Sequence, residues 1–265
     1  MSLWLVSIVV TLVGRATAST RVAFVVCREE INFFADVDCH GYERIVIYPK
    51  CGDPDGALAR LNLASDCVDV VQPPTQKFSN AAKAEETFLW DMIQWKKETI
   101  SSSVELLVYL KASTFTNVSE WRYMFETLPK VSTGIEFASF SYGRTARVDF
   151  CKHPHMQTLR KAKYSGACKG WVSLRDSFAV SASSMEKVPL SVLEAMSRSL
   201  AHPKKVNKAF SAAKAVGAYA AFVERFWQLL FGCVSIVKDG RVCLKHSNVA
   251  VFSPRGTAAL ARIVA

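Results

Sequence analysis

Several carboxylates stand where an α/β protein could use them for chemistry. Glu29 and Glu30 follow an apolar run, Val22 to Cys27, that predicts a buried strand. Because open α/β sheets bind ligands beyond the carboxyl ends of their strands, one of these acids could contact a ligand; the alternative is a solvated acidic loop. Asp36 and Asp38 have the Asp-x-Asp spacing, which in an extended segment places both carboxylates on one face, where Mn²⁺ or Mg²⁺ could bind; here too a solvated loop is the alternative.

Two further acids could act as general bases that deprotonate an acceptor hydroxyl, namely Asp91 and Asp176. The alternative for Asp91 is a place on a helix surface, and the alternative for Asp176 is a turn before a strand. Glu224 and Arg225 interrupt an apolar stretch and read as the polar edge of a helix or as a salt bridge that anchors it.

Cationic and aromatic side chains in the second half could bind a phosphate or a sugar. The phosphate candidates are Lys161, Lys163, Lys169 and Arg175, and the candidates for stacking on a sugar are Trp171 and Trp121. A solvated basic loop and ordinary core packing are the respective alternatives. The segment Cys151 to His155 contains a thiol and two imidazoles, but no second pair of ligands has a suitable spacing for zinc. Nucleophile-elbow, Walker and Rossmann glycine patterns are absent from the sequence, which disfavours the corresponding enzyme classes.

The elements that must position these residues alternate between strand and helix. Short apolar runs rich in β-branched residues predict strands over Val22 to Cys27, Arg44 to Tyr48, Val68 to Val71 and Leu106 to Leu110. Asn80 to Thr99 predicts a helix with Phe88, Met92 and Trp95 facing inward. We therefore expect an α/β fold with a mainly parallel sheet flanked by helices.

The second half is predicted to be less regular before it becomes helical. Glu120 to Leu128 predicts a short helix that ends near Pro129, and Ser139 to Lys169 predicts a long loop because its periodicity fades. Phe178 to Ser181 predicts a buried strand, followed by a helix opened by Ser183 and Ser184, and then by a helix that Gly232 ends. Asp239-Gly240 predicts a terminal β-hairpin between Val234 to Val237 and Val242 to Leu244, with Cys233 and Cys243 as plausible disulfide partners.

The N-terminus predicts export. Leu3 to Val13 is an apolar run too short to span a bilayer, and Ala16-Thr17-Ala18 suits signal peptidase, so we expect a signal peptide over residues 1–18 and a single domain over 19–265. Ala215 to Val237 is predicted to be a core helix, and no transmembrane segment is expected after the signal. Asn117 is a potential glycosylation site. A secreted or lumenal glycoprotein is the expectation.

Cysteines and charge support the same compartment. All eight cysteines follow the signal, four before residue 70 and four after residue 150, which predicts disulfides within each group. Residues 1–150 carry 15 basic and 18 acidic side chains, whereas residues 151–265 carry 18 and 5. The basic half predicts an anionic partner such as a pyrophosphate, an anionic glycan or an anionic membrane. Nucleic acid is not expected in that compartment.

Several segments resemble the motifs of a eukaryotic and microbial family catalogued as a domain of unknown function. Its members carry F-A-V-S-R, then R-P-x-x-F-Y-x-x-L, then E-R-L-W-x-x-I-F-G, which are similar to Phe178 to Ser181, Pro189 to Met196 and Glu224 to Gly232. Its Y-N-E-D and N-V-G-R-E motifs are similar to Val25 to Ile31 and Asn80 to Met92. Where the family has Glu, His and Arg, this chain has Ala84, Asp91 and Ala182, so it is a divergent member whose activity would be reduced or lost if those groups carry the chemistry.

The resemblance implies a layout like that of GT-A glycosyltransferases. It implies binding of a nucleotide-sugar or glycan in the secretory pathway, with Mn²⁺ or Mg²⁺ as the expected metal. The alternative is a secreted, disulfide-stabilised glycan-binding or interaction protein without catalysis.

Overall fold

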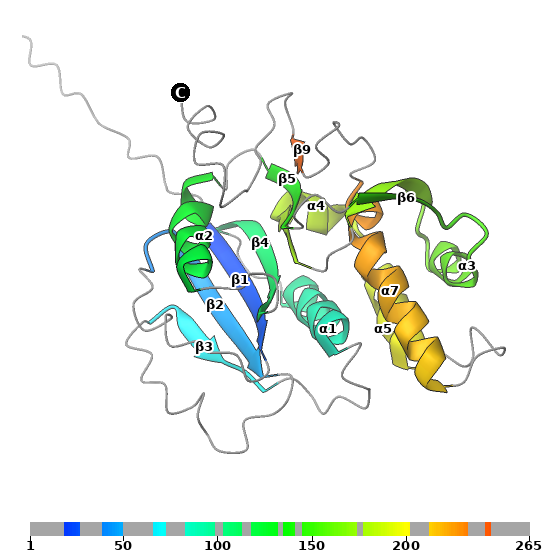
Figure 1. Cartoon of the computed structure of the whole chain (residues 1–265), viewed down its shortest axis with the longest axis horizontal. Coiled ribbons are helices and arrows are strands. Elements are labelled where there is room, and N and C mark those ends of the chain that lie inside the picture. Colours follow the sequence, from blue (N-terminus) through cyan, green and yellow to red (C-terminus); the bar gives the residue numbers. More distant parts are fainter. Residues whose placement is uncertain are drawn as a thin grey trace, which may run out of the picture.

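A mixed seven-stranded sheet forms the centre of the protein (Figure 1). The computed structural model describes residues 19–26, 39–49, 66–72, 83–98, 103–112, 118–131, 135–140, 145–173, 177–201, 212–232 and 242–244. The strand order is β3-β2-β1-β4-β8-β5-β9, and β6 and β7 form a second, two-stranded sheet. The strands of the large sheet are β1 (Ser19–Val26), β2 (Tyr42–Pro49), β3 (Val68–Val70), β4 (Val104–Lys111), β5 (Ile135–Ser139), β8 (Phe178–Ser181) and β9 (Val242–Leu244).

The first four strands form the parallel half of the sheet. β1 pairs in parallel with β2 on one side and β4 on the other, and β2 pairs in parallel with β3. β8 then pairs antiparallel with both β4 and β5, and β5 pairs antiparallel with β9. The expected α/β fold, with a parallel sheet flanked by helices, is therefore confirmed, and the antiparallel pairs on one side make the sheet mixed.

The two faces of the sheet are covered by different helices. In β1, Val22 and Phe24 face the cluster that contains α2 (Val118–Val131), whereas Ala23 and Val25 face the larger cluster that contains α1 (Lys83–Lys97). The alternation follows the two-residue period of a strand, and the continuous apolar run is needed because both faces are buried. α4 (Ala182–Lys187), α5 (Leu190–Ala201) and α7 (Ala212–Leu230) contribute to the same cluster as α1.

The long helices agree with the sequence predictions. Phe88, Met92 and Trp95 of α1 are buried, as their spacing predicted. α7 is a core helix with Phe222, Phe226, Leu229 and Leu230 buried, and Gly232 follows it with a φ of 77°. None of the helices in the described part of the chain is both long and apolar enough to cross a bilayer.

The helix predicted over residues 120–128, with its end near Pro129, is present as α2, which begins at Val118 and ends at Val131, two residues after the proline. A proline at position 129 has no N–H for the carbonyl of Phe125, four residues earlier. The hydroxyl of Tyr42 donates to that carbonyl instead, at 2.5 Å. The Tyr42 hydroxyl thus replaces the backbone N–H that Pro129 lacks, and the helix continues to Val131.

The prediction of a long loop over residues 139–169 is wrong. This region contains β6 (Thr145–Asp149), α3 (Pro154–Lys161) and the start of β7 (Lys169–Ser173). Each element is only five to eight residues long, so none produces a long periodic signal. The Cys151–Cys168 disulfide joins the two strands next to α3, and its Cα atoms are 4.9 Å apart.

Pairing of cysteines within each group is confirmed for two disulfides, Cys39–Cys67 and Cys151–Cys168. β9 is a strand as predicted, but its partner among the described residues is β5. Cys233, the strand expected over 234–237, Asn117 and the expected signal peptide over 1–18 lie outside the described residues.

Candidate functional site

The carboxyl ends of the parallel strands meet at one edge of the sheet. Val26 pairs with Pro49, and Val25 pairs with Lys111, so β1, β2 and β4 end side by side. β5 ends at the same edge, because Ser139 pairs with Phe178, which in turn pairs with Tyr109. We call the ends of β1, β2, β4 and β5 the carboxyl edge. It is the position where open α/β sheets bind ligands.

Ser177 links three strands through hydrogen bonds at the carboxyl edge. Its hydroxyl accepts a hydrogen bond from the backbone N–H of Lys111 at 2.9 Å, and its carbonyl accepts one from the N–H of Phe140 at 3.0 Å. Ser177 is fully buried. The ends of β4 and β5 and the start of β8 are therefore held in a fixed arrangement.

Five of the six acids predicted as catalytic residues or metal ligands lie outside the described residues. These are Glu29, Glu30, Asp36, Asp38 and Asp176, and Arg175 lies outside as well. Their neighbours in the chain are nevertheless placed: β1 ends three residues before Glu29, and Ser177 directly follows Asp176. The described residues nearest to Glu29 and Asp176 in the chain, Val26 and Ser177, both lie at the carboxyl edge.

Asp91 is not on a helix surface, and that alternative of the sequence prediction is wrong. It is fully buried in α1, and its carboxylate receives two hydrogen bonds from Arg21 of β1, Nη1 to Oδ2 at 2.6 Å and Nη2 to Oδ1 at 2.7 Å. The hydroxyl of Tyr48 also donates to Oδ1. A carboxylate so engaged and shielded from water is an anchor between helix and sheet, and its geometry does not suit a general base for an external hydroxyl.

The charges of this buried cluster are held by one another. Burial by itself lowers the pKa of Arg21, but the Asp91 carboxylate raises it above the usual range, so the guanidinium stays charged. Burial, and then Asp91, raises the pKa of Tyr48, and burial does the same for Tyr109 beside it. The Tyr109 hydroxyl has no partner with the geometry of a hydrogen bond among the described residues. Both tyrosines therefore stay neutral at physiological pH.

The predicted phosphate-binding lysines lie elsewhere. Lys161 ends α3, Lys163 follows it, and Lys169 begins β7, and all three side chains are exposed. They are part of the small sheet and its helix, which pack against α5 and α7, so the structure brings them together with one another but not with Asp91. Trp171 lies in β7 opposite Arg147 in the strand register. Trp121 is buried against Phe24, with ring centroids 4.9 Å apart, so the packing alternative holds for it.

The histidines near Cys151 pack against aromatic rings. Cys151 is bonded to Cys168, so its thiol is not a metal ligand. His153 stacks on Phe222 at 4.9 Å, and His155 lies 4.1 Å from Tyr219 between ring centroids. No group of three or more His, Cys, Asp or Glu side chains within the described ranges could hold a metal ion.

Three comparisons with known proteins were made for this chain. No protein-family model matches it, and neither a curated protein nor a solved structure does. Its function therefore has to be inferred from the geometry of its own residues.

The sequence contained an unused signal for the buried cluster. Asp91 is three residues after Phe88 and four before Trp95, so its position falls on the inward face of α1. Arg21 precedes the apolar run of β1 and supplies the opposite charge. For Ser177 no sequence pattern points to its role, because the groups that it bonds come from β4 and the end of β5.

Proposed function

We propose that this protein is glycosyltransferase-like and binds a nucleotide-sugar at the carboxyl edge between β1 and β4. The observation that carries the proposal is the strand order β3-β2-β1-β4. The chain adds β2 and β3 on one side of β1 and then crosses to place β4 on the other side. In open α/β sheets this reversal creates a crevice, the topological switch point, where ligands bind.

Polar residues follow the strand ends at this switch point. Glu29 and Glu30 come three and four residues after the end of β1, and Asp176 comes directly before Ser177 at the carboxyl edge. In the proposed reaction, Asp176 takes the proton of an acceptor hydroxyl. The acceptor oxygen then forms a bond to the anomeric carbon of the sugar, while the bond from that carbon to the nucleoside diphosphate breaks. Glu29 and Glu30 orient the nucleotide.

A divalent cation belongs to the proposal. Mn²⁺ or Mg²⁺ would neutralise charge on the departing diphosphate, and Asp36 and Asp38 are the carboxylates proposed to hold it. Both residues lie outside the described residues. The role of the metal is therefore tested by whether it increases the binding of a nucleotide-sugar.

The proposed setting is the secretory pathway. Two disulfides are compatible with an oxidising compartment, in which nucleotide-sugars and glycan acceptors are both available. The signal peptide over 1–18 and glycosylation at Asn117 remain part of this proposal.

The proposal is tested by thermal unfolding of the secreted protein with a panel of nucleotide-sugars, each with and without Mn²⁺. A ligand at one hundred times its Kd should stabilise the native state by about 2.7 kcal/mol. We expect one nucleotide class to raise Tm, with a larger increase when Mn²⁺ is present. The double variant E29A/E30A should lose this increase while its Tm without ligand stays unchanged.

A matched control removes the same charge away from the carboxyl edge. Glu105 and Glu126 are exposed on β4 and α2, and the variant E105A/E126A should keep the full response to the nucleotide. If no nucleotide-sugar changes the Tm of the folded protein, or if both double variants lose the response equally, the nucleotide site is refuted. The binding protein without catalysis would then be the better description.

A further inference from the structure

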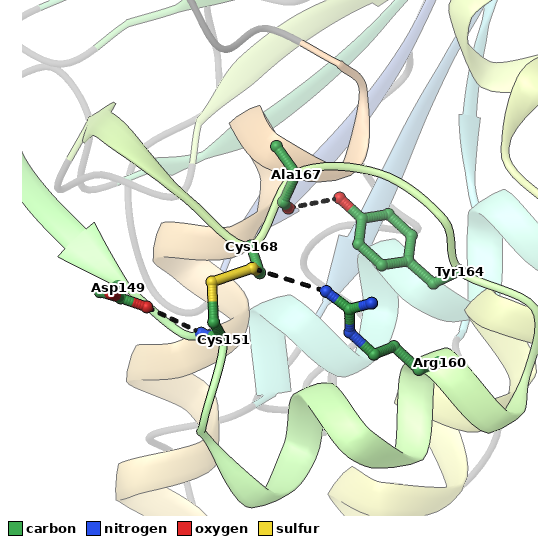
Figure 2. The surroundings of a disulfide bond; sticks show 6 residues. All are labelled: Asp149, Cys151, Arg160, Tyr164, Ala167 and Cys168. Atoms are coloured by element: carbon green, nitrogen blue, oxygen red, sulfur yellow. Dashed lines mark hydrogen bonds between the residues drawn. A yellow bond between two sulfur atoms is a disulfide. The ribbon is translucent and has the colours of Figure 1, made fainter.

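A compact basic unit packs against α5 and α7. We call residues 145–173 the stapled unit, because the Cys151–Cys168 disulfide joins β6 to β7 beside α3 (Figure 2). The unit carries one acidic side chain, Asp149, and six basic side chains. All six are exposed, and none forms an ion pair with another residue in the described part of the chain. They are Arg147, Lys152, Arg160, Lys161, Lys163 and Lys169.

The backbone that carries these six cations is held in place by core packing and by the disulfide. Met156 and Leu159 of α3 are fully buried, and the hydroxyl of Tyr164 lies within hydrogen-bond distance of two carbonyl oxygens, at 2.8 Å from Ala167 and 3.0 Å from Leu229 of α7. The guanidinium of Arg160 lies 3.6 Å from the sulfur of Cys168, as Figure 2 shows. Because a disulfide and core packing hold this backbone in place, the backbone requires little ordering before the cations bind a ligand.

Lys163 occupies a position that favours glycine. Its φ is 74°, and it directly follows the C-cap of α3. The N–H of Lys163 donates to the carbonyl of Arg160, and the N–H of Tyr164 donates to that of Leu159, which together form a Schellman motif. A lysine in this left-handed conformation is less stable than a glycine would be. The lysine therefore occupies a backbone position where glycine would be more stable. Backbone strain of this kind is concentrated at functional sites.

We propose that the stapled unit binds a polyanionic glycan, meaning a sugar chain with repeated sulfate or carboxylate groups. Its cations are distributed over a strand, a helix and a turn, so they suit a ligand whose anionic groups are also distributed along a chain. Among its exposed side chains that the structure describes, all except Pro154 are polar or charged, which favours an anionic ligand in water over the apolar interior of a membrane. Its disulfide suits an oxidising compartment, where anionic glycans are common partners. This surface is independent of the nucleotide site.

The test measures retention on immobilised heparin and its Kd by calorimetry at about 150 mM salt, with the full secreted chain. We expect K161Q/K163Q to weaken binding by about tenfold, with a shallower dependence on salt, because the variant displaces fewer counterions from the glycan. The control R44Q removes one exposed cation from β2, and the variant should bind within about twofold of the unmodified protein.

Lys163→Gly separates binding from folding. Because glycine relieves the backbone strain, the variant should have a higher Tm, yet it should bind heparin more weakly. Lys163→Arg should keep the binding.

Three results would overturn the proposal: a loss of binding per removed charge that is as large for R44Q as for K161Q/K163Q, which would mean that only net charge matters; binding to phosphatidylserine vesicles without binding to heparin; or no binding at all. The response to nucleotide-sugars should be the same in all of these variants, so a failure here would not be confused with a failure of the nucleotide site.

Discussion

Two ion pairs with the same shortest N···O distance show what burial changes at the scale of single residues. Arg21 and Asp91 approach to 2.6 Å with side chains 9% and 1% exposed, whereas Arg44 and Asp69 approach to the same distance with side chains 47% and 46% exposed. Water screens the second pair and would solvate either charge if its partner were lost. Water can neither screen the Arg21–Asp91 pair nor solvate one of its charges, because both side chains are buried.

The predicted consequence concerns the cost of removing one carboxylate. Asp91→Asn leaves the Arg21 charge buried without its counter-charge, so we expect the free energy of unfolding to fall by about 3 kcal/mol or more. Asp69→Asn should lower it by at most about 1 kcal/mol. Urea unfolding followed by circular dichroism measures both values.

Replacing both members of the buried pair provides the control. Because R21M/D91L leaves no unpaired charge, it should be less destabilising than Asp91→Asn alone. If Asp91→Asn costs no more than Asp69→Asn, the role assigned to Asp91 as an anchor between α1 and β1 is incorrect.

At the scale of elements, α3 is docked on α7 through neutral histidines. His155 is buried beside Tyr219, and His153 stacks on Phe222. Burial, and then the neighbouring His153, lowers the pKa of His155 to about 3, and burial lowers the pKa of His153. Tyr219 is the titratable group that faces His155 from α7; burial raises its pKa, so it stays neutral. Protonation of His155 would place a charge in an aromatic contact.

This arrangement predicts a loss of stability in acid. Unfolded His titrates near pH 6.5, above the folded pKa of His155, so the unfolded chain binds more protons between these values. Stability is therefore complete above about pH 6.5 and should decline toward about pH 3, by at most about 1.4 kcal/mol per pH unit for this group. The measurement is the urea midpoint at pH 7.5 and pH 5.0, with H153Q/H155Q reducing the difference.

The exposed His40 supplies the comparison. His40→Gln should leave the pH dependence as it is in the unmodified protein. A pH dependence that H153Q/H155Q does not reduce would show that the acid sensitivity comes from other groups.

At the scale of the whole molecule, one aromatic stack connects the two halves of the sheet. Phe178 of β8 stacks on Tyr109 of β4 at 5.1 Å and on Phe137 of β5 at 5.6 Å, and it also contacts Trp227 of α7 at 5.3 Å. The parallel strands, the antiparallel strands and the last long helix thus share one core. Such sharing should make them unfold together.

The prediction is that Phe178→Ala destabilises the whole described fold as a unit. Truncating this buried ring should cost about 3 to 5 kcal/mol through lost burial and a cavity. Far-ultraviolet circular dichroism and tryptophan fluorescence should give the same, lowered urea midpoint. Two separate transitions would instead divide residues 19–265 into independently folding parts and would contradict the expected single domain.

Long, strongly patterned segments could be predicted from the sequence, and short ones could not. β1, β2, β4 and α1 were predictable because each has an apolar pattern that only one arrangement can bury on both faces of a sheet or along one stripe of a helix. β6, α3 and β7 were missed because each is short and is stabilised by a disulfide and by contacts with α5 and α7. The candidate acids Glu29, Glu30 and Asp176 lie outside the described residues and stay predictions, which the ligand-binding test decides.

The amino-acid sequence by itself determined which faces of the strands and helices are apolar, and hence the layered α/β arrangement, because side-chain alternation is a local property. Only the tertiary structure decided which charged groups are buried and which are exposed. Asp91 and Lys163 each lie in or just beyond a helix, yet Asp91 is enclosed by Arg21 and Tyr48, whereas Lys163 faces solvent. The difference arises because desolvation and ion pairing depend on partners from distant parts of the chain, which the local pattern does not specify.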